Sequence, residues 1–215
     1  MKILIAAGGS GGHVFPALSV AQELRKNNHE ILFITTRGVA MEKIIQKGFK
    51  SAIISARGVS LKTPLAFFIA LSCMIKAFIE SLTVILCFRP QRVVGFGGYG
   101  AFPALFAAAL LRYPTLIHEQ NVVPGRANHI LASIVSKVAI SFKESREYFS
   151  THKTVFAGCP CRTKSTHSSN EEIFKKFHFD NSQRTILVLG GSQGSHKINE
   201  EFLKTANLLK NEMAF

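Results

Sequence analysis

Short apolar runs alternate with segments of helix length from the start of the chain to about residue 158. The runs lack the regular alternation of apolar and polar positions that marks a strand with one solvated face, so we expect both faces of each strand to be covered. Seven runs have this character: KILIA, EILFIT, SAIIS, RVVGF, TLIH, KVAIS and TVFAG. Buried strands joined by helices predict an α/β fold with a doubly wound parallel sheet.

A polar segment, KSTHSSN at Lys164–Asn170, interrupts this pattern and is typical of a connection between domains. After it, the stretch Arg184–Phe202 again predicts a strand, a glycine loop and a helix. We therefore expect one domain over residues 1–163 and the start of a second, similar domain over residues 164–215. About 45 residues follow the polar segment, too few to bury a parallel sheet of their own.

The most apolar stretch of the chain is Thr63–Cys87, in which Lys76 and Glu80 are the only charged residues. Its longest uncharged piece, Thr63–Ile75, is shorter than the roughly 20 residues that a membrane span requires, so we reject a transmembrane helix. A buried crossover helix is the default interpretation. The alternative is a helix whose Phe-rich face enters the interface of a membrane.

Three glycine-rich segments follow predicted strands and open predicted helices: Gly8–His13, Gly95–Gly100 and Gly190–Gly194. Glycine allows the backbone to approach a ligand closely, and the following helix offers unpaired N–H groups and the positive end of its dipole. The pattern predicts phosphate binding. After the first segment, we expect Pro16 to lie in the first turn of the helix.

The three glycine segments do not match the common nucleotide-binding motifs. None has the Lys followed by Ser or Thr that a Walker A loop requires, so nucleoside-triphosphate hydrolysis is not expected. The first segment has Val14 where a dinucleotide fingerprint has its last glycine, and the second strand ends in Thr36 and Arg37 rather than in an acid. An enzyme that uses NAD or FAD is kept as an alternative.

The net charge of +13 is concentrated in the first part of the chain. Between Lys43 and Arg112 there are nine basic residues and a single acid. Such a surface could face an anionic membrane or nucleic acid, or could simply be a solvated face. No recognisable nucleic-acid motif accompanies it. Because Met1 leads directly into a strand, no signal peptide is expected, and a reducing cytoplasm is the predicted compartment.

Polar residues at other strand ends are expected to lie on the same rim as His13 and Tyr99. His118–Asn121 directly follows one strand, and Arg162 follows another. The four cysteines show no repeated metal-binding spacing, and Cys159 and Cys161 are interpreted as half-buried thiols rather than as metal ligands.

Four motifs, in order along the chain, resemble those of the MurG family of bacterial cell-wall enzymes. They are GGSGGHVFPALSVAQEL, VVGFGGYGAFPALFAA, HEQNVVPGRAN and GGSQGSHKIN. Members of that family transfer N-acetylglucosamine from UDP-N-acetylglucosamine to undecaprenyl-pyrophosphoryl-N-acetylmuramyl-pentapeptide. The resemblance runs from Lys2 to about Asn199.

The resemblance implies a GT-B glycosyltransferase, in which two Rossmann-like domains face each other across a cleft. The amino-terminal domain would hold the lipid-linked acceptor, and the other domain would hold the nucleotide sugar. It also implies a peripheral position on the cytoplasmic face of the cell membrane, with an anionic membrane surface as a partner and with no metal or cofactor required.

The resemblance also assigns roles to individual residues. The positions matching contacts to the UDP sugar are Ser10, Gly11, Gly12, Asn121, Arg162 and Ser192. His13, Tyr99 and Glu119 would line the acceptor side. We expect an inverting displacement with His13 as the base, assisted by Glu119, and with Arg162 and the third glycine loop stabilising the leaving diphosphate.

The chain departs from the family pattern in three places. Cys159 replaces an Asn, Ser195 and His196 replace an Ala-Arg pair, and the second domain stops shortly after its first helix. The missing part of that domain would bind the nucleotide sugar, so we expect the 215-residue chain alone not to catalyse transfer. The alternative from another class is a non-catalytic module that binds lipid pyrophosphate or a membrane.

Overall fold

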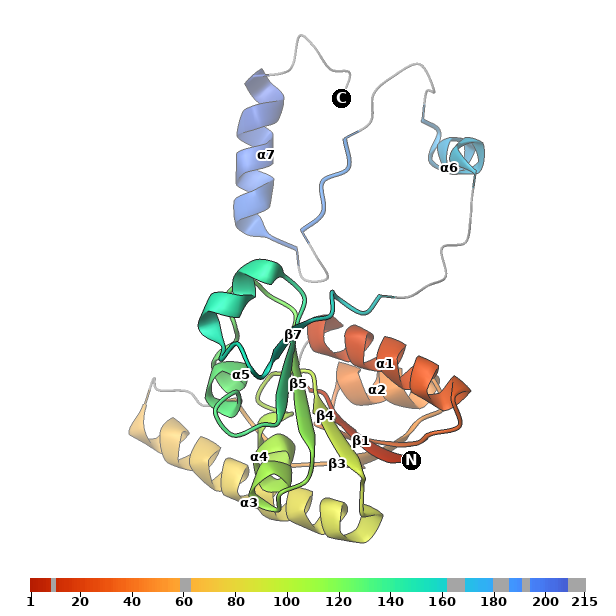
Figure 1. The fold of residues 1–215 in the computed structure, drawn as a ribbon. Coiled ribbons are helices and arrows are strands. Elements are labelled where there is room, and N and C mark those ends of the chain that lie inside the picture. Colours follow the sequence, from red (N-terminus) through yellow and green to blue (C-terminus); the bar gives the residue numbers. More distant parts are fainter. Residues whose placement is uncertain (9–10, 59–62, 162–168, 180–185, 191–193, 209–215) are drawn as a thin grey trace. The chain divides into compact units, whose positions relative to one another are not determined.

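The structure, a computed structural model, describes residues 1–8, 11–58, 63–161, 169–179, 186–190 and 194–208 (Figure 1). The chain divides into two compact units, Met1–Thr163 and Lys164–Phe215, which we call unit 1 and unit 2. Unit 1 carries the sheet. The described part of unit 2 contains helices α6 (Asn170–Phe177) and α7 (His196–Leu208).

Unit 1 is built on a parallel sheet of seven strands in the order β3-β2-β1-β4-β5-β6-β7. The strands are β1 (Lys2–Ala6), β2 (Glu30–Thr35), β3 (Lys50–Ile53), β4 (Arg92–Gly95), β5 (Thr115–Glu119), β6 (Lys137–Ile140) and β7 (Thr154–Phe156). Each lies within or overlaps one of the seven apolar runs. The predicted doubly wound α/β fold is therefore confirmed.

Helices cover both faces of this sheet (Figure 1). The helices of unit 1 are α1 (Gly11–Lys26), α2 (Val39–Gln46), α3 (Pro64–Phe88), α4 (Phe102–Leu110) and α5 (Arg126–Leu131), with a short 3₁₀ helix, η1, at Lys143–Tyr148. Residues of α1 and α2 share one apolar core with Ile3 and Ile5, whereas residues of α3, α4 and α5 share the other with Leu4 and Ala6. Successive residues of β1 thus enter opposite cores, which explains why its sequence shows no polar alternation.

The chain order reverses between β1 and β4, the two central strands. From β1 the sheet grows toward β2 on one side, and from β4 it grows toward β5 on the other. In doubly wound sheets, the loops on either side of such a reversal part and leave a crevice at the carboxyl ends of the strands. The first two glycine segments are the loops that follow β1 and β4.

These two glycine loops touch each other through their backbones. A Cβ atom added to Gly8 would lie 2.9 Å from Cα of Gly100, and one added to Gly100 would lie 3.0 Å from Cα of Gly8. Real Cβ atoms essentially never approach another heavy atom below 3.0 Å. Each loop therefore fits against the other only because both positions are glycine.

Two local expectations differ from the structure. Helix α1 already begins at Gly11, so Pro16 lies inside it rather than in its first turn. In unit 2, the described residues Ile186–Gly190 form no strand, although the apolar run predicted one, while the helix expected after them is present as α7. A strand is stabilised by pairing with a neighbour, and no described residue of unit 2 provides one.

We predict that Gly8→Ala lowers the free energy of unfolding by about 1–3 kcal/mol, because the new methyl group would overlap backbone that cannot rotate away. Urea unfolding followed by circular dichroism measures this. Gly125→Ala is the matched control, since its added Cβ meets no atom within 4 Å and its φ is −64°. Equal effects of the two substitutions would contradict the proposed contact.

Candidate functional site

The loops that follow β1, β4 and β5 meet at the carboxyl edge of the sheet in unit 1. Gly11, Gly12 and His13 form the first turn of α1, which has no acidic residue there to pair with its free N–H groups. The His13 ring lies against the second glycine loop, because a Cβ atom added to Gly98 would come within 3.2 Å of its Cδ2 atom. Gly98 has a φ of +77°, a conformation that favours glycine.

Hydrogen bonds connect His13 to the end of β5 and to the chain beyond β7. The Nδ1 atom of His13 lies 3.2 Å from Oε1 of Gln120. The Nε2 atom of Gln120 lies 3.1 Å from Nδ1 of His118, and Nε2 of His118 lies 3.0 Å from the carbonyl oxygen of Gly158. Three polar side chains and one carbonyl group thus form one continuous array.

His118 is the most deeply placed histidine of this array, with 3% of its surface exposed. Burial lowers its pKa below the ordinary value of 6.5, while the Gly158 carbonyl and the negative charge of Glu119 act in the opposite direction. Its ring also packs 5.5 Å from the ring of Phe96, centroid to centroid. His118 is therefore neutral near pH 7.

Glu119 is buried and holds the loop that follows β5. One carboxylate oxygen accepts hydrogen bonds from the backbone N–H and side-chain amide of Asn121, and the other accepts from the Gly125 N–H and the Asn128 amide. These four bonds are 2.9–3.1 Å long. The role that this geometry supports is to fix the loop, with exposed Asn121 at its start.

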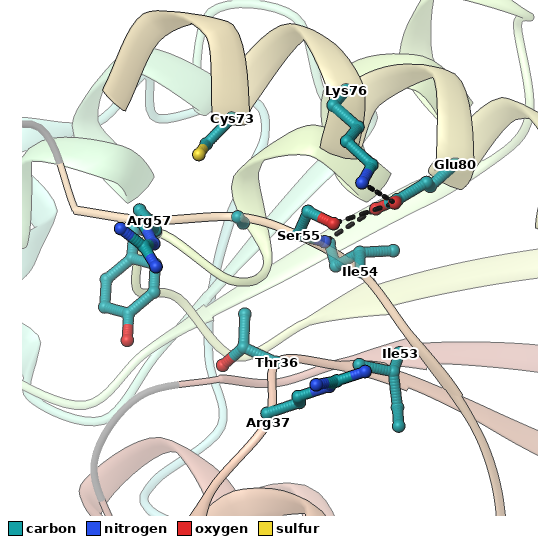
Figure 2. Close-up of a pocket in the computed structure, with 11 residues that line it drawn as sticks. Thr36, Arg37, Ile53, Ile54, Ser55, Arg57, Cys73, Lys76 and Glu80 are labelled. Atoms are coloured by element: carbon teal, nitrogen blue, oxygen red, sulfur yellow. Dashed lines mark hydrogen bonds and ion pairs between the residues drawn. The ribbon is translucent and has the colours of Figure 1, made fainter. Parts of the chain in front are cut away.

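Tyr99 is one of the residues that line an open cavity of about 700 Å³. This cavity lies between the ends of β2 and β3 and helix α3 (Figure 2). Arg37 and Arg57 line this cavity, and neither forms an ion pair within the described part of the chain. Ile53, Ile54 and Cys73 supply apolar surface. The cavity therefore combines positive charge with an apolar wall.

The carboxylate of Glu80 attaches α3 to the segment after β3 and so fixes the side of α3 that lines this cavity. The carboxylate of Glu80 accepts hydrogen bonds from the Ser55 backbone N–H at 2.6 Å and from the Ser55 hydroxyl at 2.8 Å (Figure 2). Lys76, one turn earlier, lies 3.9 Å from the same carboxylate. Both charged residues of this apolar helix thus face the cavity side.

A further face of α3, away from its buried residues, is apolar and exposed. Ala70, Ala77 and Ile85 are buried against the rest of unit 1, but most of the helix is not. The exposed residues at helical spacing, which we call the α3 stripe, are Leu65, Phe68, Ile75, Ile79 and Leu86, each with more than half of its surface exposed. The interpretation of α3 as a buried crossover helix is therefore wrong for this face.

By length and composition alone, Leu65–Phe88 would pass as a membrane-spanning helix, and 22% of its most apolar window is buried in the structure. Its bonds to Ser55 and its packing on α4 nevertheless attach it to the sheet domain along one side. This arrangement resembles a helix that lies along an interface more than one that crosses it.

The structure brings some of the expected site residues together and leaves others apart. His13 lies against the second glycine loop and shares the first turn of α1 with Gly11 and Gly12, Tyr99 lines the cavity, and Glu119 and Asn121 are bonded to each other. Ser10, Arg162 and Ser192 lie outside the described residues. Cys159 and Cys161 are exposed rather than half-buried. Gln120, which was expected on the same rim as His13 without a role of its own, contacts it directly, and Arg37 and Arg57 are candidate site residues that the sequence reasoning did not propose.

The parallel sheet and its paired glycine loops make unit 1 a Rossmann-like domain, and the family match that follows identifies it as the amino-terminal domain of a GT-B glycosyltransferase. Residues 3–140 match the family model for the glycosyltransferase family 28 N-terminal domain. The chain therefore belongs to glycosyltransferase family 28.

Named relatives agree with this assignment. The chain is 40% identical over 203 residues to the UDP-N-acetylglucosamine–N-acetylmuramyl-(pentapeptide) pyrophosphoryl-undecaprenol N-acetylglucosamine transferase of Thermodesulfovibrio yellowstonii, covering 93% of this chain and 56% of that protein. It is 35% identical to the enzyme of the same name from Acetivibrio thermocellus, covering 100% of this chain and 59% of that protein. The chain thus spans somewhat more than half the length of these relatives.

A solved structure gives the same result. The crystal structure of Acinetobacter baumannii MurG matches with a TM-score of 0.62 and 28% sequence identity, over 78% of this chain and 47% of that one. The predicted family resemblance and the predicted GT-B fold are confirmed.

We predict that His118 makes stability depend on pH below its ordinary pKa of 6.5. Because its pKa is lowered in the folded state, the unfolded chain takes up the proton first as the pH falls, so the free energy of unfolding decreases from pH 6.5 down to the lowered value. Replacing His118 by Asn removes this contribution, whose slope is limited to about 1.4 kcal/mol per pH unit for one proton.

The measurement is urea unfolding at a series of pH values for both proteins. His152→Asn, at an exposed histidine near the start of β7, controls for the loss of one imidazole. The same pH slope in His118→Asn and in the unmodified chain would show that burial of His118 does not govern acid stability.

Proposed function

We propose that unit 1 is the acceptor-binding domain of a transferase that moves N-acetylglucosamine from UDP-N-acetylglucosamine to undecaprenyl-pyrophosphoryl-N-acetylmuramyl-pentapeptide. The observation that carries the proposal is the family 28 match over residues 3–140, which takes in the first two glycine loops and the sheet strands from β1 to β6. The names of the 35–40% identical relatives supply the two substrates.

In this proposal the glycine loops after β1 and β4 hold the acceptor's pyrophosphate. Their mutual contact brings the two loops to one place, and the amino end of α1 adds its positive dipole. His13 stands beside this place and acts as the base. Tyr99, at the rim of the cavity, lines the acceptor side.

The reaction is an inverting displacement. A hydroxyl oxygen of the acceptor sugar forms a bond to the anomeric carbon of N-acetylglucosamine while the bond from that carbon to the UDP oxygen breaks. The hydroxyl proton passes to His13, and UDP leaves with the bonding electron pair. Glu119 would act on this step indirectly, since its carboxylate already accepts four hydrogen bonds from the loop after β5.

The donor side is proposed from the family resemblance. Gly11, Gly12 and Asn121 would face UDP-N-acetylglucosamine, together with Ser10, Arg162 and Ser192. Unit 2 would form the start of the nucleotide-sugar domain, with the third glycine loop near the diphosphate. No metal or cofactor enters the proposed chemistry.

The cavity beside Tyr99 offers a further contact for the acceptor. Arg37 and Arg57 suit an anionic group, and the apolar wall suits an attached carbon chain. A ligand that carries both is a lipid-linked pyrophosphate with its sugar-peptide. The cavity therefore supports the acceptor side of the proposal.

We further propose that the α3 stripe lies on the cytoplasmic face of the cell membrane. An exposed apolar face on an attached helix suits the membrane interface, and Arg89, which follows the carboxyl end of α3, is an exposed cation available to anionic lipid. In this proposed arrangement a lipid-linked substrate reaches the cavity from the membrane, and α3 does not need to span the bilayer. Nucleic acid is not a partner in this proposal.

A chimera tests the transferase proposal. We predict that this chain, joined to the carboxyl-terminal remainder of the T. yellowstonii relative, transfers labelled N-acetylglucosamine from its UDP derivative to the lipid-linked muramyl-pentapeptide. His13→Ala should lower kcat about 10²–10⁴-fold, the usual contribution of a positioned base.

His152→Ala provides the control, because His152 lies just before the amino end of β7, whereas His13 lies near the carboxyl ends of the strands. An active chimera that keeps its rate in His13→Ala would contradict His13 as the base. A folded chimera that binds neither substrate would contradict the proposed function itself.

A sedimentation experiment tests the membrane proposal. Replacing Ile75 and Ile79 together by Gln should weaken binding to liposomes containing anionic lipid by about thirty-fold, which corresponds to about 2 kcal/mol of lost apolar burial. Val39→Gln with Ile45→Gln is the matched control, because these exposed apolar residues lie on α2, on the other face of the sheet. Equal losses in both pairs would argue against a specific role for the α3 stripe.

A further inference from the structure

The hydrogen bonds around Gln120 fix more than the positions of the two histidines, because they also determine which ring nitrogen of each carries a proton. Neutral imidazole has one nitrogen that donates and one that accepts, and the partners decide which is which. The array that runs from Gly158 through His118 and Gln120 to His13 can be assigned from its carbonyl groups alone.

The orientation of the Gln120 amide is set by two backbone carbonyl groups. One terminal atom of this amide lies 3.0 Å from the carbonyl oxygen of Phe96 and 3.2 Å from that of His118. A carbonyl oxygen only accepts hydrogen bonds, so this atom must be the NH₂ nitrogen. The reversed amide would bring its oxygen against both carbonyl oxygens. The Gln120 oxygen therefore points to His13.

The tautomer of His118 is set in the same way. Its Nε2 atom lies 3.0 Å from the Gly158 carbonyl oxygen, so Nε2 carries the hydrogen. Its Nδ1 atom, 3.1 Å from the Gln120 nitrogen, then accepts from that amide and shares one of its two hydrogens with the His118 carbonyl oxygen, which requires the ring to be neutral. Burial lowers the pKa of His118 and favours that neutral form.

The assignment ends at His13. The Gln120 oxygen can only accept, so Nδ1 of His13 must donate to it across 3.2 Å. In the neutral ring, Nε2 then keeps a free lone pair, and no described residue forms a hydrogen bond with it. A Cβ atom added to Gly98 would lie 3.5 Å from Nε2, so this nitrogen faces the second glycine loop.

We propose that Gln120 and His118 are positioning residues that hold neutral His13 as the Nδ1–H tautomer, with Nε2 as the proton acceptor toward the glycine loops. The role of that lone pair in transfer rests on the proposed function, whereas the tautomer itself does not. When Nε2 takes the proton of the attacking hydroxyl, Nδ1 keeps its own, and the positive ring remains hydrogen-bonded to the Gln120 oxygen. Gln120 neither gains nor loses a proton.

Side-chain ¹⁵N nuclear magnetic resonance of the labelled chain tests the tautomer directly. The spectrum is recorded at a pH where His13 is neutral, and its signals among the eight histidines are identified by their loss in His13→Gln. We expect the shift of an unprotonated nitrogen at Nε2 and that of a protonated nitrogen at Nδ1. The opposite assignment, or a mixture of both tautomers, would overturn the proposal.

Two substitutions at Gln120 have different expected results. Gln120→Ala removes the acceptor, so the single-tautomer pattern of His13 should be lost. Gln120→Glu keeps an acceptor for His13, and its other oxygen replaces the nitrogen that faces the carbonyl groups of Phe96 and His118, so we expect the new carboxyl group to keep a proton there and donate it to one of them. His13 should then keep its pattern, while the Nδ1 signal of His118 should shift because the amide donor is lost. A purely structural role for Gln120 would change both histidines alike in the two variants, and that result would also overturn the proposal.

Gln46→Ala is the matched control, since Gln46 is an exposed residue at the end of α2 and should leave both histidines unchanged. Unaltered signals from the remaining histidines show that each variant is folded. Because this readout needs no substrate, an inactive chimera with the expected tautomer would reject the proposed function and leave the positioning role intact.

Discussion

The backbone contact between Gly8 and Gly100 is the constraint on which the rest of the site depends. It joins the loops after the two central strands at the point where the strand order reverses, and no side chain intervenes. This closeness places the first turn of α1 beside the loop after β4 and brings His13 against Gly98. At Gly8 and Gly100 the two loops thus meet through main chain, and each of them follows a strand of the sheet.

At the end of β5, three successive residues form hydrogen bonds on two different sides of the strand. Adjacent residues of a strand point to opposite sides, so His118 and Gln120 face His13 while Glu119 faces the following loop. One side of the strand orients the His13 ring, and the other holds the loop that carries Asn121. The short motif therefore supports both the position of His13 and the shape of its surroundings.

The sequence predicted the seven strands, the parallel sheet and the edge at which the site lies, because buried strands and glycine loops leave strong local patterns. It did not predict that Gln120, rather than Glu119, contacts His13, since that requires knowing where the alternation of β5 begins. Nor could it place Arg37 and Arg57 together, as they follow different strands and meet only in the folded sheet. The run before the third glycine loop looked like a strand because apolar content alone does not reveal whether a partner strand is present.

Helix α3 was ambiguous because nearly every position in it is apolar, so composition could not distinguish its covered face from its exposed one. The bonds from Glu80 to Ser55 decide which face of α3 is covered, because they fix the rotation of the helix about its own axis. Because the residues of the α3 stripe are mostly exposed, one apolar side chain there can replace another with little effect on the free energy of unfolding. Substituting Glu80 is different, since it removes both bonds that hold the helix in this rotation, whereas substituting Ser55 removes only the hydroxyl bond and keeps the one from its backbone N–H.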